Sequence, residues 1–250
     1  MKKIVIANWK MNPQSQKEAE VLFRAITKGK ISKKVDVVIC PPVIFLEKLK
    51  KLSSKIALGA QNVFYEKKGA FTGEISAEML SNLGVKYVII GHSERRALGE
   101  TNQDVNKKIK IALSFGLIPI VCIGEEERDE NHEYFNIIKS QIEECFDGLN
   151  KAILSRIIIA YEPVWALSTT EDRKDATPAD SLEMVIFIKK VISDKFGGKF
   201  VMPRIIYGGS VDEKNCNDFL NNGGVVGALV GGASLNAEKF LKIINIAGNN

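Results

Sequence analysis

The sequence lacks the features that would anchor it in a membrane or cross-link it. Two lysines lead directly into Ile4-Val5-Ile6, an apolar run too short for a signal peptide, and no apolar stretch approaches the roughly 20 residues that span a bilayer. The four cysteines lie far apart with no CxxC or Cys/His spacing, which favours reduced thiols over disulfides or a zinc site. We therefore expect a soluble, cytoplasmic protein with no membrane partner and no metal.

Charge of one sign is only slightly in excess. Lys and Arg number 35 against 30 Asp and Glu, a formal net charge of +5, and the basic residues are spread along the whole sequence. We therefore expect a mildly basic surface. This balance slightly favours small anionic substrates and argues little for a nucleic-acid partner.

What the sequence has in abundance is an alternation between two kinds of segment. Short runs rich in Val and Ile alternate with longer segments whose apolar residues recur at three- and four-residue steps, as in amphipathic helices. We predict eight strands, at residues 3–7, 35–40, 56–60, 85–90, 118–123, 157–161, 204–207 and 227–230. Predicted helices include 14–28, 102–115, 134–146 and 179–195, the last opened by a hydroxyl cap at Thr177 and by Pro178.

Eight strand–helix units in 250 residues predict an α/β fold of the (β/α)₈ TIM-barrel class, with a parallel eight-stranded closed sheet. An open doubly wound sheet more often has five or six strands, and its GxGxxG fingerprint is missing after the first strand. No linker rich in Pro, Gly or Ser interrupts the pattern. We therefore expect residues 1–250 to form a single catalytic domain.

Polar residues that follow the predicted strands are the candidates for chemistry, because the active site of such a barrel forms at the C-terminal ends of its strands. Asn8 and Lys10 follow the first strand, His92 the fourth and Glu162 the sixth. Lys10 alone could be an exposed loop lysine, and His92 alone a capping or core histidine. A carboxylate at the end of an apolar strand, however, is costly unless it is paired or used. Together, the four residues indicate a catalytic site.

Glycine pairs follow the last two strands. Gly208-Gly209 precedes Ser210, and Gly231-Gly232 precedes Ala233. Where there is no Cβ, peptide N–H groups can approach an anion closely, and a phosphate site after the seventh and eighth strands is common in these barrels. We expect these turns to bind a substrate phosphate.

Seven motifs resemble those of the triosephosphate isomerase family, in the family's order, over nearly the whole chain. They are NWKMN at 8–12, GAFTGE at 69–74, GHSERR at 91–96, CIGE at 122–125, AYEPVWA at 160–166, YGGS at 207–210 and GGASL at 231–235. The resemblance implies a glycolytic and gluconeogenic isomerase that interconverts dihydroxyacetone phosphate and D-glyceraldehyde 3-phosphate through an enediolate. The resemblance implies no cofactor and no metal.

The resemblance also assigns roles at matching positions. Glu162 would be the base, and a neutral His92 would polarise the substrate carbonyl, as is established for this family. Lys10 would supply positive charge to the enediolate and the phosphate, Asn8 would donate a hydrogen bond, and Glu94 would hold Lys10 in place.

Further residues are implied at the phosphate, the lid and a dimer contact. Ser210, Gly231, Gly232 and the lid residue Ser168 would bind the phosphate, while Leu167, Leu229 and Tyr207 would clamp the closed lid over the base. The segment 69–74 resembles one that inserts into a partner subunit. It would place Thr72 at the partner's active site and pair Glu74 with Arg95, which implies a homodimer.

The lid departs from the family pattern. Residues 165–178 form a segment about three residues longer than the usual lid, without its glycines, and Ser168 stands where a glycine would give its N–H to the phosphate. Glu171, Asp172 and Asp175 add negative charge near a dianionic phosphate, and Arg173 and Lys174 partly offset it. We expect slower or differently timed closure rather than loss of activity, because gating and chemistry use separate parts.

Two other functions stay open. An isomerase or aldolase acting on a larger sugar phosphate could use the long lid, although the predicted strands hold no lysine for a Schiff base beyond Lys3 and Lys86 at their margins. A catalytically idle phosphate-binding barrel is the second alternative. The intact set of Asn8, Lys10, His92 and Glu162 argues against it.

Overall fold

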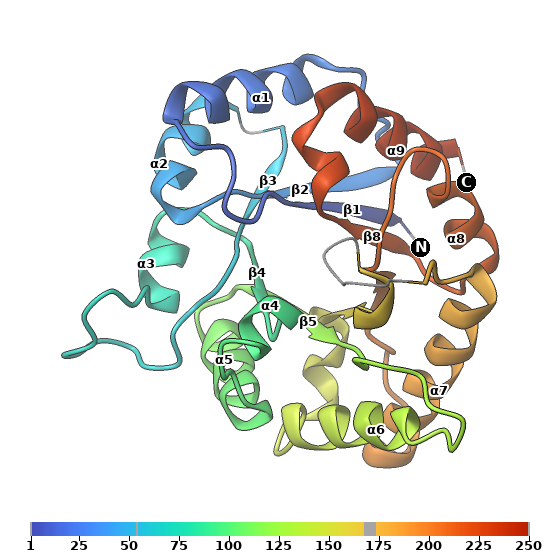
Figure 1. Ribbon diagram of the computed structural model, residues 1–250. Helices are drawn as coiled ribbons and strands as arrows, with labels where there is room; N and C mark the ends of the chain where they lie inside the picture. The colour runs from blue at the N-terminus through green and yellow to red at the C-terminus, as the bar shows by residue number, and fades with distance from the viewer. Residues whose placement is uncertain (1, 54, 168–173, 250) are drawn as a thin grey trace.

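Eight parallel strands form a closed barrel surrounded by helices, as the sequence predicted (Figure 1). The computed structural model describes residues 2–53, 55–167 and 174–249. Each strand pairs with the next, and β8 pairs with β1 to close the ring. The strands are β1 (Lys3–Asn8), β2 (Val35–Cys40), β3 (Ala57–Ala60), β4 (Tyr87–Ile90), β5 (Ile118–Ile123), β6 (Ile158–Tyr161), β7 (Arg204–Tyr207) and β8 (Gly227–Val230).

Helices follow the strands and cover the outside of the barrel (Figure 1). They are α1 (Gln16–Lys28), α2 (Val43–Leu52), α3 (Ala77–Asn82), α4 (Ser93–Arg96), α5 (Asn102–Ser114), α6 (Tyr134–Cys145), α7 (Pro178–Phe196), α8 (Cys216–Asn222) and α9 (Ala237–Asn249). Short 3₁₀ segments are η1 (Lys151–Arg156), η2 (Val164–Ala166) and η3 (Gly232–Leu235). Across the described residues, each helix is too short or too polar to cross a membrane.

The start of α7 is fixed by a capping box. The hydroxyl of Thr177 accepts the N–H of Asp180, and the carboxylate of Asp180 accepts the N–H of Thr177 at 2.7 Å. Pro178 occupies the first turn, where its missing N–H is not needed. The predicted helix start is confirmed, and the capping box fixes the residue at which α7 begins.

The core has two layers because alternate residues of a strand face opposite sides. In β1, Val5 and Ala7 pack outward against the helices, while Ile4 and Ile6 fill the interior of the barrel. Side chains therefore fill the interior of the barrel. The active site of such a barrel lies at the C-terminal ends of its strands, where the loops that follow the strands gather.

Candidate active site

A cavity of about 790 Å³ opens at the C-terminal ends of the strands. Nine of the predicted site residues line it: Asn8, Lys10, His92, Glu162, Leu167, Ser210, Leu229, Gly231 and Gly232. They belong to β1, β4, β6, β7 and β8 or to the loops that follow these strands. The closed barrel thus brings together side chains that are more than 200 residues apart in the sequence.

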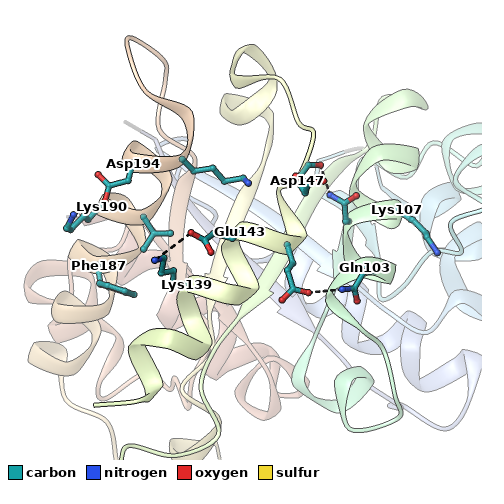
Figure 2. Close-up of a pocket in the computed structure, with 12 residues that line it drawn as sticks. Gln103, Lys107, Lys139, Glu143, Asp147, Phe187, Lys190 and Asp194 are labelled. Atoms are coloured by element: carbon teal, nitrogen blue, oxygen red, sulfur yellow. Dashed lines mark hydrogen bonds and ion pairs between the residues drawn. The ribbon is translucent and has the colours of Figure 1, made fainter. Parts of the chain in front are cut away.

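A second cavity, of about 860 Å³, is a groove on the outer surface between α5, α6 and α7 (Figure 2). Polar and charged side chains line it, and several of them pair with one another. Gln103 donates to Glu144 at 2.8 Å, and Lys190 pairs with Asp194 at 2.7 Å. No predicted site residue lies in this groove. The mouth of the barrel is therefore the better candidate for the active site.

Glu162 follows β6 directly, and its side chain is buried, with 2% exposed. Its Oε2 accepts the N–H of Ser93 at 3.1 Å. Its Oε1 lies 3.5 Å from Nε2 of His92 and has no hydrogen-bond partner among the described residues. A buried carboxylate oxygen without a partner is costly, so its retention at the cavity fits a group that acts on a ligand.

His92 caps α4, and this contact identifies the form of its ring. The N–H of Glu94 donates to Nδ1 at 3.2 Å. A ring nitrogen accepts a hydrogen bond only when it carries no proton, so the contact corresponds to a neutral imidazole with its proton on Nε2. Nε2 is also the nitrogen that faces Glu162. His92 therefore serves as a cap and at the same time presents an N–H donor toward Glu162.

Lys10 is held at both its backbone and its side chain. Its φ of 52° lies in the left-handed region, which non-glycine residues rarely adopt. The N–H of Lys10 donates to Oδ1 of Asn8 at 3.0 Å, and Nζ pairs with Oε1 of Glu94 at 2.5 Å. An unusual backbone conformation held by specific contacts is typical of functional sites.

The glycine turns after β7 and β8 line the same cavity, beside Glu162 and Lys10. A Cβ built on Gly208 would lie 2.7 Å from Cγ of Glu162, so this position excludes larger residues. A Cβ built on Gly232 would meet nothing within 4 Å, which leaves its peptide open to a ligand. Ser210 donates its hydroxyl to the carbonyl of Ala166 at 3.0 Å. Ser168, the remaining predicted phosphate contact, lies outside the described residues.

Known proteins match this chain over almost its full length. Residues 3–247 match a family described as Triosephosphate isomerase. A triosephosphate isomerase from Dehalococcoides mccartyi is 47% identical over 249 residues, which cover 97% of this chain and 96% of that protein. One from Alkaliphilus oremlandii is 44% identical over 250 residues, covering 98% of this chain and 99% of that protein.

The chain belongs to the triosephosphate isomerase family. It is therefore an isomerase, and the family resemblance of its motifs is confirmed.

Two residues that support this triosephosphate isomerase site were not predicted from the sequence. Gln61, which follows β3, donates to the carbonyls of Lys10 and Cys40 at 2.8 and 2.9 Å and so fixes the loop after β1. Glu100 accepts the N–H of Gly91, the residue before His92, at 3.1 Å. Both act on backbone groups, and no spacing of residue types signals that in a sequence.

The buried carboxylate of Glu100 also pairs with two cations. Its Oε2 pairs with Nε of Arg95 at 2.8 Å and with Nζ of Lys108 at 3.1 Å. Burial lowers the pKa of Lys108, and the charge of Glu100 opposes that shift. Within one chain, Arg95 is thus paired with Glu100, while its predicted partner Glu74 is exposed.

The predicted clamp and dimer residues differ in their surroundings. Tyr207 is buried and stacks on Phe219, with ring centroids 3.9 Å apart. Thr72 is exposed in the segment between β3 and α3, which stands away from the body of the barrel (Figure 1).

The part of the chain that the structure describes brings together no group of three or more His, Cys, Asp or Glu side chains suited to a metal ion.

Proposed function

We propose that this chain interconverts dihydroxyacetone phosphate and D-glyceraldehyde 3-phosphate with Glu162, His92 and Lys10 as its catalytic residues. The observation that carries the proposal is that these three side chains and the glycine turns line one cavity. A carboxylate can act as base, a neutral imidazole N–H can polarise a carbonyl, and a fixed ammonium can stabilise an oxyanion. The family's reaction needs these three functions and no cofactor.

The proton transfer begins at Glu162. Its carboxylate takes a proton from the carbon beside the carbonyl, and the C–H electron pair forms the double bond of the enediolate as the carbonyl π electrons move onto oxygen. The N–H at Nε2 of His92 stabilises that oxygen and passes its proton between the two oxygens. The protonated Glu162 then returns its proton to the neighbouring carbon. The carboxylate enters the reaction with Oε2 bonded to the N–H of Ser93 and with Oε1, which faces His92, without a hydrogen-bond partner among the described residues.

Lys10, Asn8 and Glu94 would set the electrostatics. Oδ1 of Asn8 is committed to the backbone of Lys10, which leaves its amide N–H groups as donors to the substrate. Glu94 is not part of the cavity lining but pairs with Lys10, so its role is to position the ammonium. Such preorganised groups need little rearrangement when negative charge develops on the enediolate.

The phosphate and clamp assignments complete the proposal. The open peptide of Gly232, together with Gly231 and Ser210, supports a phosphate cradle after β7 and β8. Leu167 and Leu229 line the same cavity as Glu162, which supports their role in excluding water from the base. Ser168 and Tyr207 keep their proposed roles in phosphate binding and at the lid on the resemblance alone.

The test is a coupled assay that starts from glyceraldehyde 3-phosphate and follows dihydroxyacetone phosphate. Glu162→Gln should lower kcat by several powers of ten with little change in KM, because a base acts chiefly in the transition state. Glu143→Gln removes a carboxylate on the outer face of α6, which does not line the active-site cavity, and should leave kcat unchanged. Turnover by Glu162→Gln at the wild-type rate would refute the assignment of the base, and phosphate binding without turnover in the wild type would favour an idle barrel.

We also propose that the protein is a homodimer. Large apolar side chains are exposed on the loops and short helices that follow the first four strands, including Met11 at 84%, Leu98 at 80% and Ile44 at 75%. Exposed apolar residues gathered in one region are typical of protein interfaces. Thr72 and Glu74 would cross into the partner, where Glu74 would meet Arg95. Light scattering should give twice the chain mass of 27.6 kDa, and Leu98→Arg should shift the protein toward monomer; a monomeric wild type would refute the dimer.

The remaining proposals concern the lid and the chain as a whole. Asp175 lines the cavity that holds the glycine turns, which supports the expectation that lid charge opposes a phosphate dianion and slows closure. Asp175→Thr should therefore lower KM for both triose phosphates. Steady-state rates of the wild type equal to those of an ordinary-lid isomerase would contradict a slower lid. We further propose that residues 1–250 act as one catalytic domain in cytoplasmic glycolysis and gluconeogenesis.

A further inference from the structure

Arg128 lies in the loop after β5, outside the cavity, and uses every N–H of its guanidinium. Nε donates to Oε1 of Glu125 at 3.3 Å. Nη1 donates to Asp180 at 3.0 Å and to Glu183 at 2.9 Å. Nη2 donates to the hydroxyl of Tyr161 at 3.4 Å and to the carbonyl of Asp180 at 3.2 Å. Five donors therefore meet five acceptors, which is the full capacity of an arginine.

One side of the Arg128 guanidinium contacts side chains that hold the segment after the proposed base. Glu125 is fully buried, and its Oε1 also accepts Nε1 of Trp165 and the hydroxyl of Tyr161, each at 2.8 Å. The backbone carbonyl of Glu125 accepts the N–H of Val164 at 2.9 Å. The ring of Trp165 lies over the guanidinium, 5.3 Å from Cζ of Arg128. Residues on both sides of Glu162 are thus tied to Arg128 and Glu125.

The other side of the Arg128 guanidinium contacts the start of α7. Oδ2 of Asp180 closes the capping box with Thr177, while Oδ1 accepts from Arg128. Thr177 and Pro178 line the active-site cavity, as does Leu167 at the end of the other segment. One side chain therefore connects the two described segments that lead into and out of residues 168–173.

We propose that Arg128 is a positioning residue that fixes Glu162 and the two ends of the lid relative to each other. This inference rests on the function proposed above. Arg128 does not line the cavity and touches no group assigned to the chemistry, so it acts through Glu125, Trp165 and Asp180.

The electrostatics of this cluster favour arginine over lysine. Burial by itself would lower the pKa of Arg128, but the Tyr161 hydroxyl and the Glu125 carboxylate raise that pKa overall, so the guanidinium stays charged. Oε2 of Glu125 has no hydrogen-bond partner among the described residues, which makes the neighbouring positive charge the more important. A lysine ammonium is a compact group without a planar fork, and it cannot reach Glu125, Tyr161 and Asp180 together.

The experiment compares Arg128→Met, Arg128→Lys and Glu183→Gln with the wild type in the triose phosphate assay, at a temperature where circular dichroism shows each to be folded. Both Arg128 variants should lose at least about tenfold in kcat, because small displacements of a base are costly, while KM changes less than about threefold. Glu183 is the matched control. It is 46% exposed, and glutamine keeps an acceptor for Nη1, so both kinetic constants should stay within about twofold.

Acrylamide quenching of tryptophan emission supplies a second readout. Trp9 is fully buried and contributes equally in all variants, so a larger quenching constant in the Arg128 variants would report the exposure of Trp165. Full kcat with unchanged quenching in Arg128→Lys would overturn the inference, even if Arg128→Met failed to fold. An equal loss of kcat in Glu183→Gln would also overturn it. An inactive wild type would instead refute the proposed function.

Discussion

Gly124→Ala tests whether the backbone behind Glu162 sets the rate. Gly124 follows β5, and a Cβ built on it would lie 1.7 Å from the carbonyl oxygen of Glu162 and 2.6 Å from its carbonyl carbon. Gly124 cannot easily move away, because its N–H and carbonyl are both held by the side-chain amide of Gln141 at 2.9 Å. The backbone of Glu162 must therefore give way.

The size of the displacement follows from these contacts. A real Cβ essentially never lies closer than 3.0 Å to such an atom, so relief from 1.7 Å requires a shift of about 1.3 Å. A misplacement of about 1 Å at an active site can cost a factor of about 100 in rate. We therefore expect kcat to fall at least about 100-fold, with a loss of about 1–3 kcal/mol in the free energy of unfolding.

Gly227→Ala is the matched control. A Cβ built on Gly227 would lie 2.0 Å from the carbonyl oxygen of Ile4, so it causes a similar backbone clash. Gly227 begins β8, at the end of the barrel opposite the cavity. Urea unfolding should therefore show a comparable loss of stability, while kcat of the folded protein stays within about threefold of the wild type.

Two outcomes would refute this reasoning. The first is a folded Gly124→Ala protein whose kcat lies within tenfold of the wild type, which would mean that the base tolerates a displaced backbone. The second is an equal loss of kcat in Gly227→Ala, which would mean that strain anywhere in the barrel suffices.

Two further predictions concern the scaffold. Thr101 forms a capping box with Asp104 at the start of α5, so Thr101→Ala should cost about 1 kcal/mol in urea unfolding. The Thr101 hydroxyl holds the pKa of Asp104 below its ordinary value of 3.8, so the stability that this bond contributes is present above pH 3.8 and is lost as the pH falls. The free energy of unfolding of the Thr101→Ala variant should therefore fall less steeply with acid than that of the wild type. All four cysteines are buried, and burial raises the pKa of Cys145 and Cys216 to about 11. At pH 8 a disulfide reagent should therefore modify the thiols of the native protein slowly, and it should modify all four per chain after unfolding. Rapid modification of the native protein would contradict the burial of these cysteines.

The strands were predictable because β-branched runs covered on both faces leave a clear pattern. The predicted bounds of β2, β5, β7 and β8 are confirmed, whereas the prediction 85–90 for β4 begins two residues too early. The N–H of Val85 donates to the carbonyl of Leu80 in α3, and Gly84 has a φ of 80°. Val85 therefore belongs to the turn that ends the helix, although its side chain continues the apolar run.

Residues that support the site were harder to predict than those that line it. Glu162 and His92 are marked by their positions after strands, which the sequence reveals. Arg128 is marked by contacts with residues as distant in sequence as Asp180, 52 residues away, and Gln61 by bonds to backbone carbonyls. Such contacts depend on the register between elements, which the residue types do not encode locally.

Folding also brings together positive charges that lie far apart in the sequence. Lysines scattered between residues 2 and 86 gather around a cavity of about 440 Å³ at the N-terminal ends of β2 to β4, which Lys2, Lys50, Lys55 and Lys86 line. Asp36 is the only carboxylate among the described residues of its lining. The closed barrel thus creates a local concentration of positive charge on a chain whose basic residues are spread along the whole sequence.

Closure of the barrel is also what confines the proposed base. The loop after β6 has neighbours on both sides: Ile123 of β5 accepts the N–H of Glu162 at 2.8 Å, and Gly208 after β7 packs against its side chain. The loops after β1 and β4 lie across the mouth and supply Lys10 and His92. In an open sheet, the neighbouring strands could confine the glutamate, but β1 would lie at a distant edge. Ring closure therefore does two things at once, since it restrains Glu162 laterally and brings the ammonium of Lys10 and the imidazole of His92 to the cavity that the glycine turns also line.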